Sequence, residues 1–274
     1  MDHELNALIV NQNSEVFRTY EKDLLEFGYT IHHCSAKASE ITAQAIITEC
    51  DIILLSSNDL ENEDELAEII DFFKGAGTKT PPMILNSPMT RTRKTDELID
   101  HCSFAFNIFP TGERRSIIID IERNTNYKNM DCEKLFFLLR QKIIYDCGFI
   151  GINKNQEGYK WISEAVLLIL TDSGYRKNFS AGVYKVLCNK YNATYTQIEP
   201  AIRRSMNDLH KRMKPLIRVY YFDLDANSGE KYTATHFINK IADNIKIQYK
   251  RNYTAFMSFA DADRRKVINK YFAK

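Results

Sequence analysis

Short apolar runs alternate with helical patterns along the first 125 residues, and this alternation constrains the fold more than any other feature of the chain. The runs are typical of buried strands: "ALIV" at 7–10, "TIHHC" at 30–34, "DIILL" at 51–55, "PPMILNS" at 81–87 and "FAFNIF" at 104–109. Strands that are apolar on both faces and are joined by helices indicate a parallel sheet covered by helices. We therefore predict a doubly wound α/β domain with a five-stranded parallel sheet over residues 1–126.

The rest of the chain, residues 127–274, has helical periodicity instead. Helices are predicted over 131–148, 158–174, 180–192 and 196–212. Asp131 and Ser180 are the expected N-caps of the first and third helices, and Thr196 with Glu199 forms a predicted capping box for the fourth. A small hairpin is an alternative for 216–234, and residues 251–274 are expected to add one or two helices that pack on this domain or on a second subunit.

The two parts carry opposite charge. Residues 1–129 hold 12 basic and 22 acidic side chains, a net charge of −10, whereas residues 130–274 hold 25 and 14, a net charge of +11. A basic domain joined to an acidic one indicates that the basic half meets a polyanion. Solvated charged faces without a partner are the alternative.

The third and fourth predicted helices are joined by a short link, which is the plan of a helix-turn-helix. Ile198, Ala201, Ile202, Ser205 and Met206 would pack inward. The outer face would contact double-stranded DNA through Gln197, Pro200, Arg203, Arg204 and Asn207, and lysines and an arginine around it would neutralise phosphates: Lys177, Lys185, Lys190, Lys211 and Arg212. An amphipathic helix with a solvated basic face in a bundle is the alternative.

Other classes of function find little support in the sequence. The six cysteines form no CxxC pair, and "DLDANSG" at 223–229 lacks the spacing of a calcium loop, so we expect no metal and no cofactor. No nucleophile with a base is recognisable, so we do not expect an enzyme. The N-terminus lacks the basic residues of an export signal, and no apolar run approaches the roughly 20 residues of a membrane span, so we expect a cytoplasmic protein.

Residues 5–125 resemble the receiver domain of response regulators, which has a flavodoxin-like fold. A receiver holds Mg²⁺ with acids after its first strand and accepts a phosphoryl group on an aspartate after its third. This chain departs from that pattern. It has Asn11 and Gln12 after the first strand and Ser56 after the third, and its residues at the site after the fourth and fifth strands, Asn86 and Phe109, depart from the receiver pattern as well. The resemblance therefore implies a receiver scaffold whose phosphorylation site is degenerate.

Residues 130–250 resemble the effector domain of the master sporulation response regulator family of endospore-forming bacteria. The matching words are "IIYDCG", "GYKWISEAV", "VYKVLCNKYNAT", "IEPAIRRSM" and "FINKIADNIKI". The resemblance implies an all-helical domain that binds DNA through a helix-turn-helix. Glu199 and Arg203 keep the family's residue types on the recognition helix, while Gln197 and Pro200 replace arginines and Arg204 replaces a histidine. The chain also continues beyond the family's usual end.

Two functions follow from these patterns. The first is a sequence-specific transcription regulator that works without phosphorylation, pairs as a homodimer through its receiver-like domain, and meets RNA polymerase or a related regulator as a further partner. The alternative is an interaction protein that does not bind DNA and pairs with an authentic regulator of the same family, as an antagonist or a co-regulator. The altered recognition helix motivates the alternative.

Overall fold

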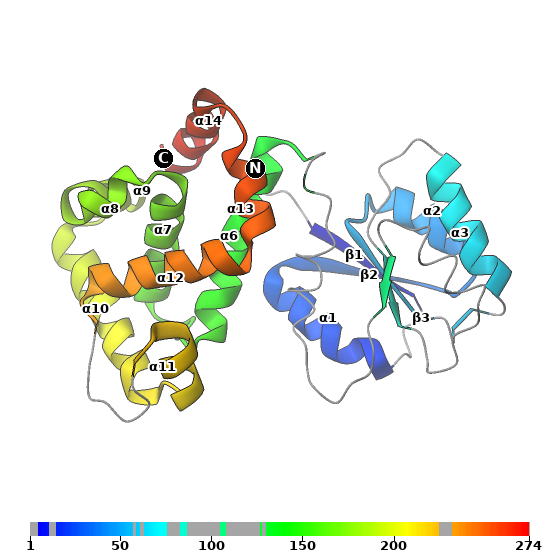
Figure 1. The fold of residues 1–274 in the computed structure, drawn as a ribbon, viewed down its shortest axis with the longest axis horizontal. Helices are drawn as coiled ribbons and strands as arrows, with labels where there is room; N and C mark the ends of the chain where they lie inside the picture. The colour runs from blue at the N-terminus through cyan, green and yellow to red at the C-terminus, as the bar shows by residue number, and fades with distance from the viewer. Residues whose placement is uncertain are drawn as a thin grey trace. The chain divides into compact units, whose positions relative to one another are not determined.

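The computed structural model of the chain describes residues 5–10, 15–56, 59–60, 63–75, 83–86, 105–107, 127, 130–224 and 232–273. The chain divides into two compact units, Met1–Asn126 and Tyr127–Lys274, both drawn in Figure 1. The first contains a parallel sheet with helices, and every described element of the second is a helix. The predicted order of an α/β part followed by an all-helical part is confirmed.

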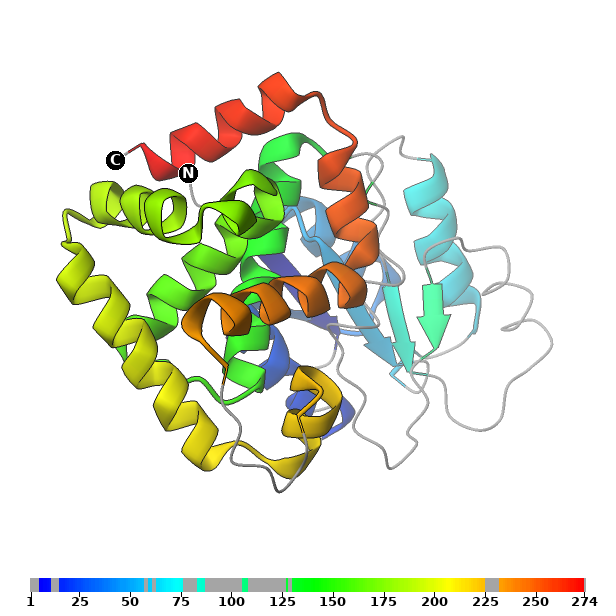
Figure 2. The same cartoon turned by 60° about the vertical axis from the view of Figure 1, so that its left-hand side comes forward.

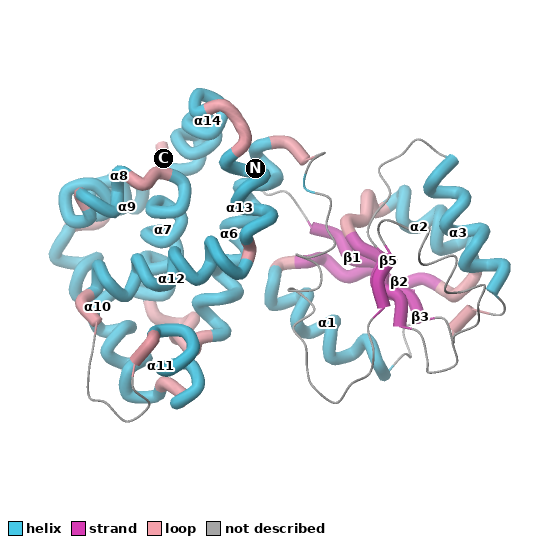
Figure 3. Tube along the Cα trace, in the orientation of Figure 1, coloured by secondary structure: helices cyan, strands magenta, loops and turns pink. Residues whose placement is uncertain are grey.

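Parallel strands build the sheet of the first unit. Within the described residues these are β1 (Leu5–Val10), β2 (Tyr29–Cys34), β3 (Ile52–Ser56), β4 (Met83–Asn86) and β5 (Ala105–Asn107), in the order β2-β1-β3-β4-β5. Parallel neighbours require crossovers, and three of them contain α1 (Glu15–Phe27), α2 (Ala38–Ile47) and α3 (Glu63–Gly75). Figure 3 shows α1 on one side of the sheet and α2 with α3 on the other. In this flavodoxin-like order β2 is added on one side of β1 and β3 to β5 on the other, so the direction in which strands are added switches between β1 and β3.

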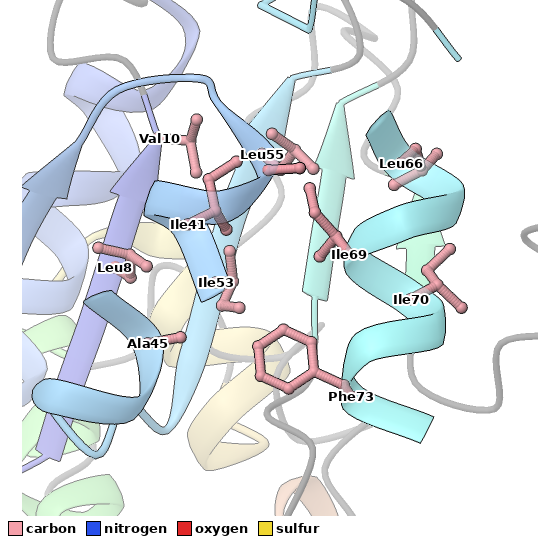
Figure 4. Close-up of a cluster of buried hydrophobic side chains, with 11 residues drawn as sticks. Leu8, Val10, Ile41, Ala45, Ile53, Leu55, Leu66, Ile69, Ile70 and Phe73 are labelled. Atoms are coloured by element: carbon pink, nitrogen blue, oxygen red, sulfur yellow. The ribbon is translucent and has the colours of Figure 1, made fainter. Parts of the chain in front are cut away.

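An apolar cluster fills the space between this sheet and the helices α2 and α3 (Figure 4). Alternate residues of a strand point to the same face, which brings Leu8 and Val10 of β1 beside Ile53 and Leu55 of β3. The helices contribute Ile41, Ala45, Leu66, Ile69, Ile70 and Phe73. Every residue of β3 is buried, so its other face is covered too. The prediction of strands buried on both faces is therefore confirmed for β1 and β3, whereas most residues of β2 are only half-buried.

The second unit is a bundle arranged around α7. Its elements are α6 (Cys132–Phe149), α7 (Glu157–Thr171), α8 (Gly174–Lys177), the π-helical segment η2 (Phe179–Val183), α9 (Tyr184–Tyr191), α10 (Tyr195–Arg212), α11 (Pro215–Phe222), α12 (Ala234–Gln248), α13 (Lys250–Met257) and α14 (Asp261–Phe272). Every α7 residue in 161–171 is buried. A helix that is buried on all sides belongs at the centre of a bundle, and α6, α10 and α12 pack against it (Figures 1 and 2).

Several local predictions can be compared with this bundle. The Asp131 side chain accepts a hydrogen bond from the Lys134 backbone nitrogen at 2.7 Å, so the predicted cap of α6 is confirmed. Ser180 does not cap a helix, because it lies inside η2, and that prediction is wrong. The hairpin is wrong where the chain is described, since residues 215–222 form α11. Pro215 at the first helical turn favours this start because its fixed φ suits a helix.

The segment after α12 forms helices, as predicted. α13 packs on α6, and α14 packs on both α6 and α9. Of the two expected contacts, with this domain or with a second subunit, the structure contains the first. Within the described part of the chain, no helix is both long and apolar enough to cross a membrane.

Candidate nucleic-acid interface

The helices α9 and α10 are joined by a turn of three residues, Asn192 to Thr194. Asn192 ends α9 in the left-handed region, at φ 47°, a conformation that asparagine tolerates better than most residues. The Tyr184 and Tyr195 rings, one from the start of each helix, meet edge to face with centroids 5.0 Å apart. The turn and this aromatic contact fix the two helices relative to each other.

The first turn of α10 is capped by a different pair from the one predicted. Thr194 is the N-cap residue, and its backbone nitrogen donates to Gln197 Oε1 at 2.8 Å. The predicted box of Thr196 with Glu199 is wrong by two residues. As a consequence, the amide oxygen of Gln197 is already engaged at the start of the helix.

One face of α10 packs into the bundle. The predicted inward set of Ile198, Ala201, Ile202, Ser205 and Met206 is buried, which confirms that prediction.

The packing of α10 on α7 is close as well as apolar. A Cβ added to Gly158 of α7 would lie 2.4 Å from the Ala201 carbonyl oxygen, so this glycine allows the backbones to approach. Gln156, just before α7, accepts from Ser205 Oγ at 2.6 Å and donates to Asp208 Oδ2 at 2.8 Å. The buried face of α10 is therefore held by apolar packing and by polar contacts together.

The opposite face of α10 is open to solvent. Its exposed side chains include Gln197, Pro200, Arg203, Arg204, Lys211 and Arg212, and Asn207 is half-buried. Positions 200, 204, 207 and 211 recur at intervals of three or four residues, with 203 beside 204, so they follow one stripe along the helix. The structure thus gathers most of the predicted contact residues on a single helical surface.

An acid on the same helix holds one of the two central arginines. Arg203 Nε donates to Glu199 Oε1 at 3.0 Å, one turn apart on α10, and the Arg203 Nη2 atom reaches the same oxygen. The Arg203 side chain is nevertheless 60% exposed, whereas Glu199 is 18% exposed. Arg212 is paired with Asp208 in the same way, with Nη2 and Oδ2 3.6 Å apart. The exposed guanidinium groups are oriented by the helix and remain accessible.

Pro200 lies deeper in α10 than the sequence predicts. It is the sixth residue of the helix that begins at Tyr195, whereas the predicted cap at Thr196 would have made it the fourth, so it stands in the second turn. There an ordinary residue would donate its N–H to the carbonyl of Thr196, a bond that proline cannot make. The start of α10 is therefore held with one backbone hydrogen bond fewer than usual.

The flanking basic residues divide into two groups. Lys177 at the end of α8 and Lys185 on α9 are exposed. The Lys190 side chain is only 8% exposed, and its Nζ lies 3.4 Å from Glu164 Oε2 in the bundle. Burial lowers the pKa of Lys190 to about 8, although the Glu164 carboxylate opposes this change. Lys190 consequently belongs to the interior and not to the open face.

The group around Glu164 was not predicted from the sequence. Glu164 of α7 is 3% exposed and accepts from the Tyr271 hydroxyl of α14 at 2.5 Å, while Arg140 of α6 lies 3.7 Å away. A signal for it did exist, because Glu164 is a charged residue inside a long apolar helical run. A buried carboxylate requires partners, but only the structure identifies them.

The residues of the predicted degenerate phosphorylation site are described in part. Ser56 ends β3, is 3% exposed, and stands opposite Asn86 of the neighbouring strand β4. Asn11, Gln12 and Phe109 lie outside the described residues. Among the residues that the structure does describe, no group of histidine, cysteine and acidic side chains could hold a metal ion.

The helical unit was compared with known protein families. Residues 144–245, which are 102 of the 274 residues, match the family model described as "Sporulation initiation factor Spo0A C terminal". The match begins within α6, includes the whole of α7 to α11, and ends within α12. It contains both helices of the candidate interface and leaves α13 and α14 outside. The helical part of the chain is thus similar to the C-terminal domain of a sporulation initiation factor.

Proposed function

We propose that the chain is a sequence-specific DNA-binding transcription regulator. In this proposal α9 and α10 form a helix-turn-helix, and α10 enters the major groove, which is wide enough for a helix. The single observation that carries the proposal is the open stripe of α10, with Arg203 and Arg204 side by side, inside the segment that matches the sporulation-factor domain. The resemblance of this segment to the DNA-binding effector domain of that family supports the assignment.

The proposed roles follow from side-chain chemistry. Arg204 is the main candidate for a bidentate contact with guanine, because arginine presents two parallel donors. Arg203 is oriented by Glu199, and Glu199 could also accept from a cytosine amino group. Gln197, Pro200 and Asn207 lie along the same face.

Phosphate contacts are assigned to basic side chains around α10. These are Lys177, Lys185, Lys211 and Arg212, all of which are exposed. Lys190 is left out because its ammonium group is buried beside Glu164.

The first unit is proposed to act without phosphorylation. A serine hydroxyl cannot form the acyl phosphate that an aspartate forms, and Ser56 occupies the end of β3 where that aspartate would be expected. Pairing of these units into a homodimer, contact with RNA polymerase or a related regulator, a cytoplasmic location and the absence of enzymatic activity all remain predictions.

A second candidate function is an antagonist that pairs with a related regulator and does not bind DNA. Three features of α10 favour it: the amide oxygen of Gln197 is used as a cap, Arg203 is paired with Glu199, and Pro200 stands on the face that would read bases. Each of them reduces the hydrogen-bonding groups free to contact bases.

Selection of bound duplexes from a random pool separates the two functions. The full chain is expected to enrich one motif, and the Arg203→Ala, Arg204→Ala double variant is expected to lose it. Lys22→Ala serves as a control, because it removes an exposed positive charge on α1 in the other unit. Absence of any enriched motif, together with recovery of a related regulator in a pull-down, would support the antagonist instead.

A further inference from the structure

α14 lies outside the matched segment, yet it packs beside the first helix of the candidate interface. It contacts α6 and α9. Figures 1 and 2 both show it, in red, next to the part of the bundle that contains α8 and α9. The sporulation-factor match ends at residue 245, so this contact is an addition to the matched domain.

Tyr271 near the end of α14 connects two of the other helices. Its hydroxyl accepts from Arg140 Nε of α6 at 2.5 Å and donates to Glu164 Oε1 of α7 at 2.5 Å. Its ring also packs against Phe136 of α6, with centroids 5.4 Å apart. One side chain of α14 thus satisfies a buried carboxylate and fixes the arginine beside it.

The same ring covers Lys190 of α9. The Lys190 Nζ atom lies 3.1 Å from the centroid of the Tyr271 ring and 4.5 Å from that of Phe272. The other oxygen of Glu164 completes its surroundings at 3.4 Å. An ammonium group held between a carboxylate and aromatic faces is stabilised by both, so α14 closes the site in which α9 is anchored.

Lys190 and Lys185 lie on different faces of the same short helix. α9 has eight residues and cannot hold its shape without packing, because isolated helices of that length are unstable. Leu187 and the Lys190 side chain lie on its buried side, while Lys185 is exposed to solvent. Whatever holds Lys190 in place therefore also determines where Lys185 is presented.

We propose that α14 is a clamp in which Tyr271 is a positioning residue: it holds α9 through Lys190 and Glu164, so that Lys185 is presented to a DNA phosphate. The DNA part of this inference rests on the proposed function. The positioning of α9 does not, and it can be measured without DNA.

The first measurement is amide hydrogen exchange over α9 in the full chain. Tyr271→Ala is expected to speed exchange in α9 about tenfold or more while the centre of α7 is unchanged, because loss of the clamp frees one local element. Tyr271→Phe keeps the ring over Lys190 and should give a smaller increase. Lys270→Ala is the matched control, since it removes a neighbouring surface pair with Glu133, 2.8 Å apart, and leaves the cluster intact. Unchanged exchange in α9 in both Tyr271 variants would overturn the clamp.

The second measurement is a double-mutant cycle in DNA binding. It uses only variants whose helical content equals that of the original chain. Tyr271→Ala and Lys185→Ala are each expected to weaken binding about fivefold. Each should also reduce the slope of log affinity against log salt concentration by the equivalent of about one phosphate contact. The double variant should lose little more than either single variant. Additive losses would overturn the link to Lys185. If the unmodified chain binds no DNA sequence, the proposed function fails, while exchange in α9 still decides the clamp.

Discussion

Replacement of Asp146 by asparagine should stabilise the helical unit at neutral pH. Asp146 lies on α6 with no exposed surface, and its Oδ2 atom accepts a hydrogen bond from the Tyr221 hydroxyl of α11. Burial raises the pKa of this carboxyl from 3.8 to about 7, because the charged form loses its hydration, although hydrogen bonds from Tyr221 and Gln248 oppose the rise. An asparagine keeps an oxygen for Tyr221 and cannot ionise.

The size and sign of the effect follow from linkage. Between the two pKa values the unfolded chain has lost this proton while the folded one keeps it, so the free energy of unfolding falls as the pH rises through this range. A rise from 3.8 to about 7 corresponds to about 4 kcal/mol, all of which is expressed above pH 7. The advantage of Asp146→Asn should therefore grow by about 2 kcal/mol between pH 5.5 and pH 8.

Urea unfolding at these two pH values measures the difference. Trp161 is the single tryptophan and lies on the buried helix α7, so its fluorescence follows the helical unit alone. Asp263→Asn, which removes an exposed carboxylate on α14, should show no such growth with pH. A variant at position 146 that is no more stable than the original chain at pH 8, or whose advantage does not change with pH, would refute this account of the buried carboxyl.

Two further predictions concern the packing of α10 and the proposed loss of the phosphorylation site. Gly158→Ala should destabilise the helical unit by about 1–3 kcal/mol in the same urea assay, since the new methyl group would lie 2.4 Å from a backbone oxygen; a neutral effect would mean that α7 and α10 are not packed this closely. Incubation of the full chain with acetyl phosphate and Mg²⁺ should leave its intact mass unchanged, because serine cannot form an acyl phosphate, and a stable gain of one phosphoryl group would contradict the proposed loss of phosphotransfer.

Much of the fold could be predicted because the decisive signals are local. The apolar run "IILL" that follows Asp51 and the alternation around it are enough to identify a strand buried on both faces, and Asp131 precedes an apolar helical pattern as a cap should. The buried face of α10 followed from its periodicity for the same reason.

The errors arose where local signals were ambiguous or where distant residues decided the outcome. Thr194 with Gln197 and Thr196 with Glu199 both have the spacing of a capping box, and the choice between them depends on where α9 ends. The β-branched and aromatic residues of 216–222 favour a strand locally, yet they form α11.

Lys190 looked like a surface residue because its partners are remote in the sequence. Glu164 is 26 residues away on α7, and Tyr271 belongs to α14, so neither could be assigned to it from spacing. The candidate interface was thus predictable as a helical stripe, whereas the buried cluster behind it required the structure.

Equilibrium binding of the full chain to the duplex that it enriches, measured over a range of salt concentrations, tests the central claim most directly. The account predicts that Arg204→Ala weakens binding about tenfold, because a bidentate arginine contact contributes about 1–3 kcal/mol of discrimination, while Lys22→Ala stays within about twofold. Equal binding by the original chain and Arg204→Ala, or equal affinity for the enriched duplex and an unrelated one, would contradict the claim that α10 reads DNA.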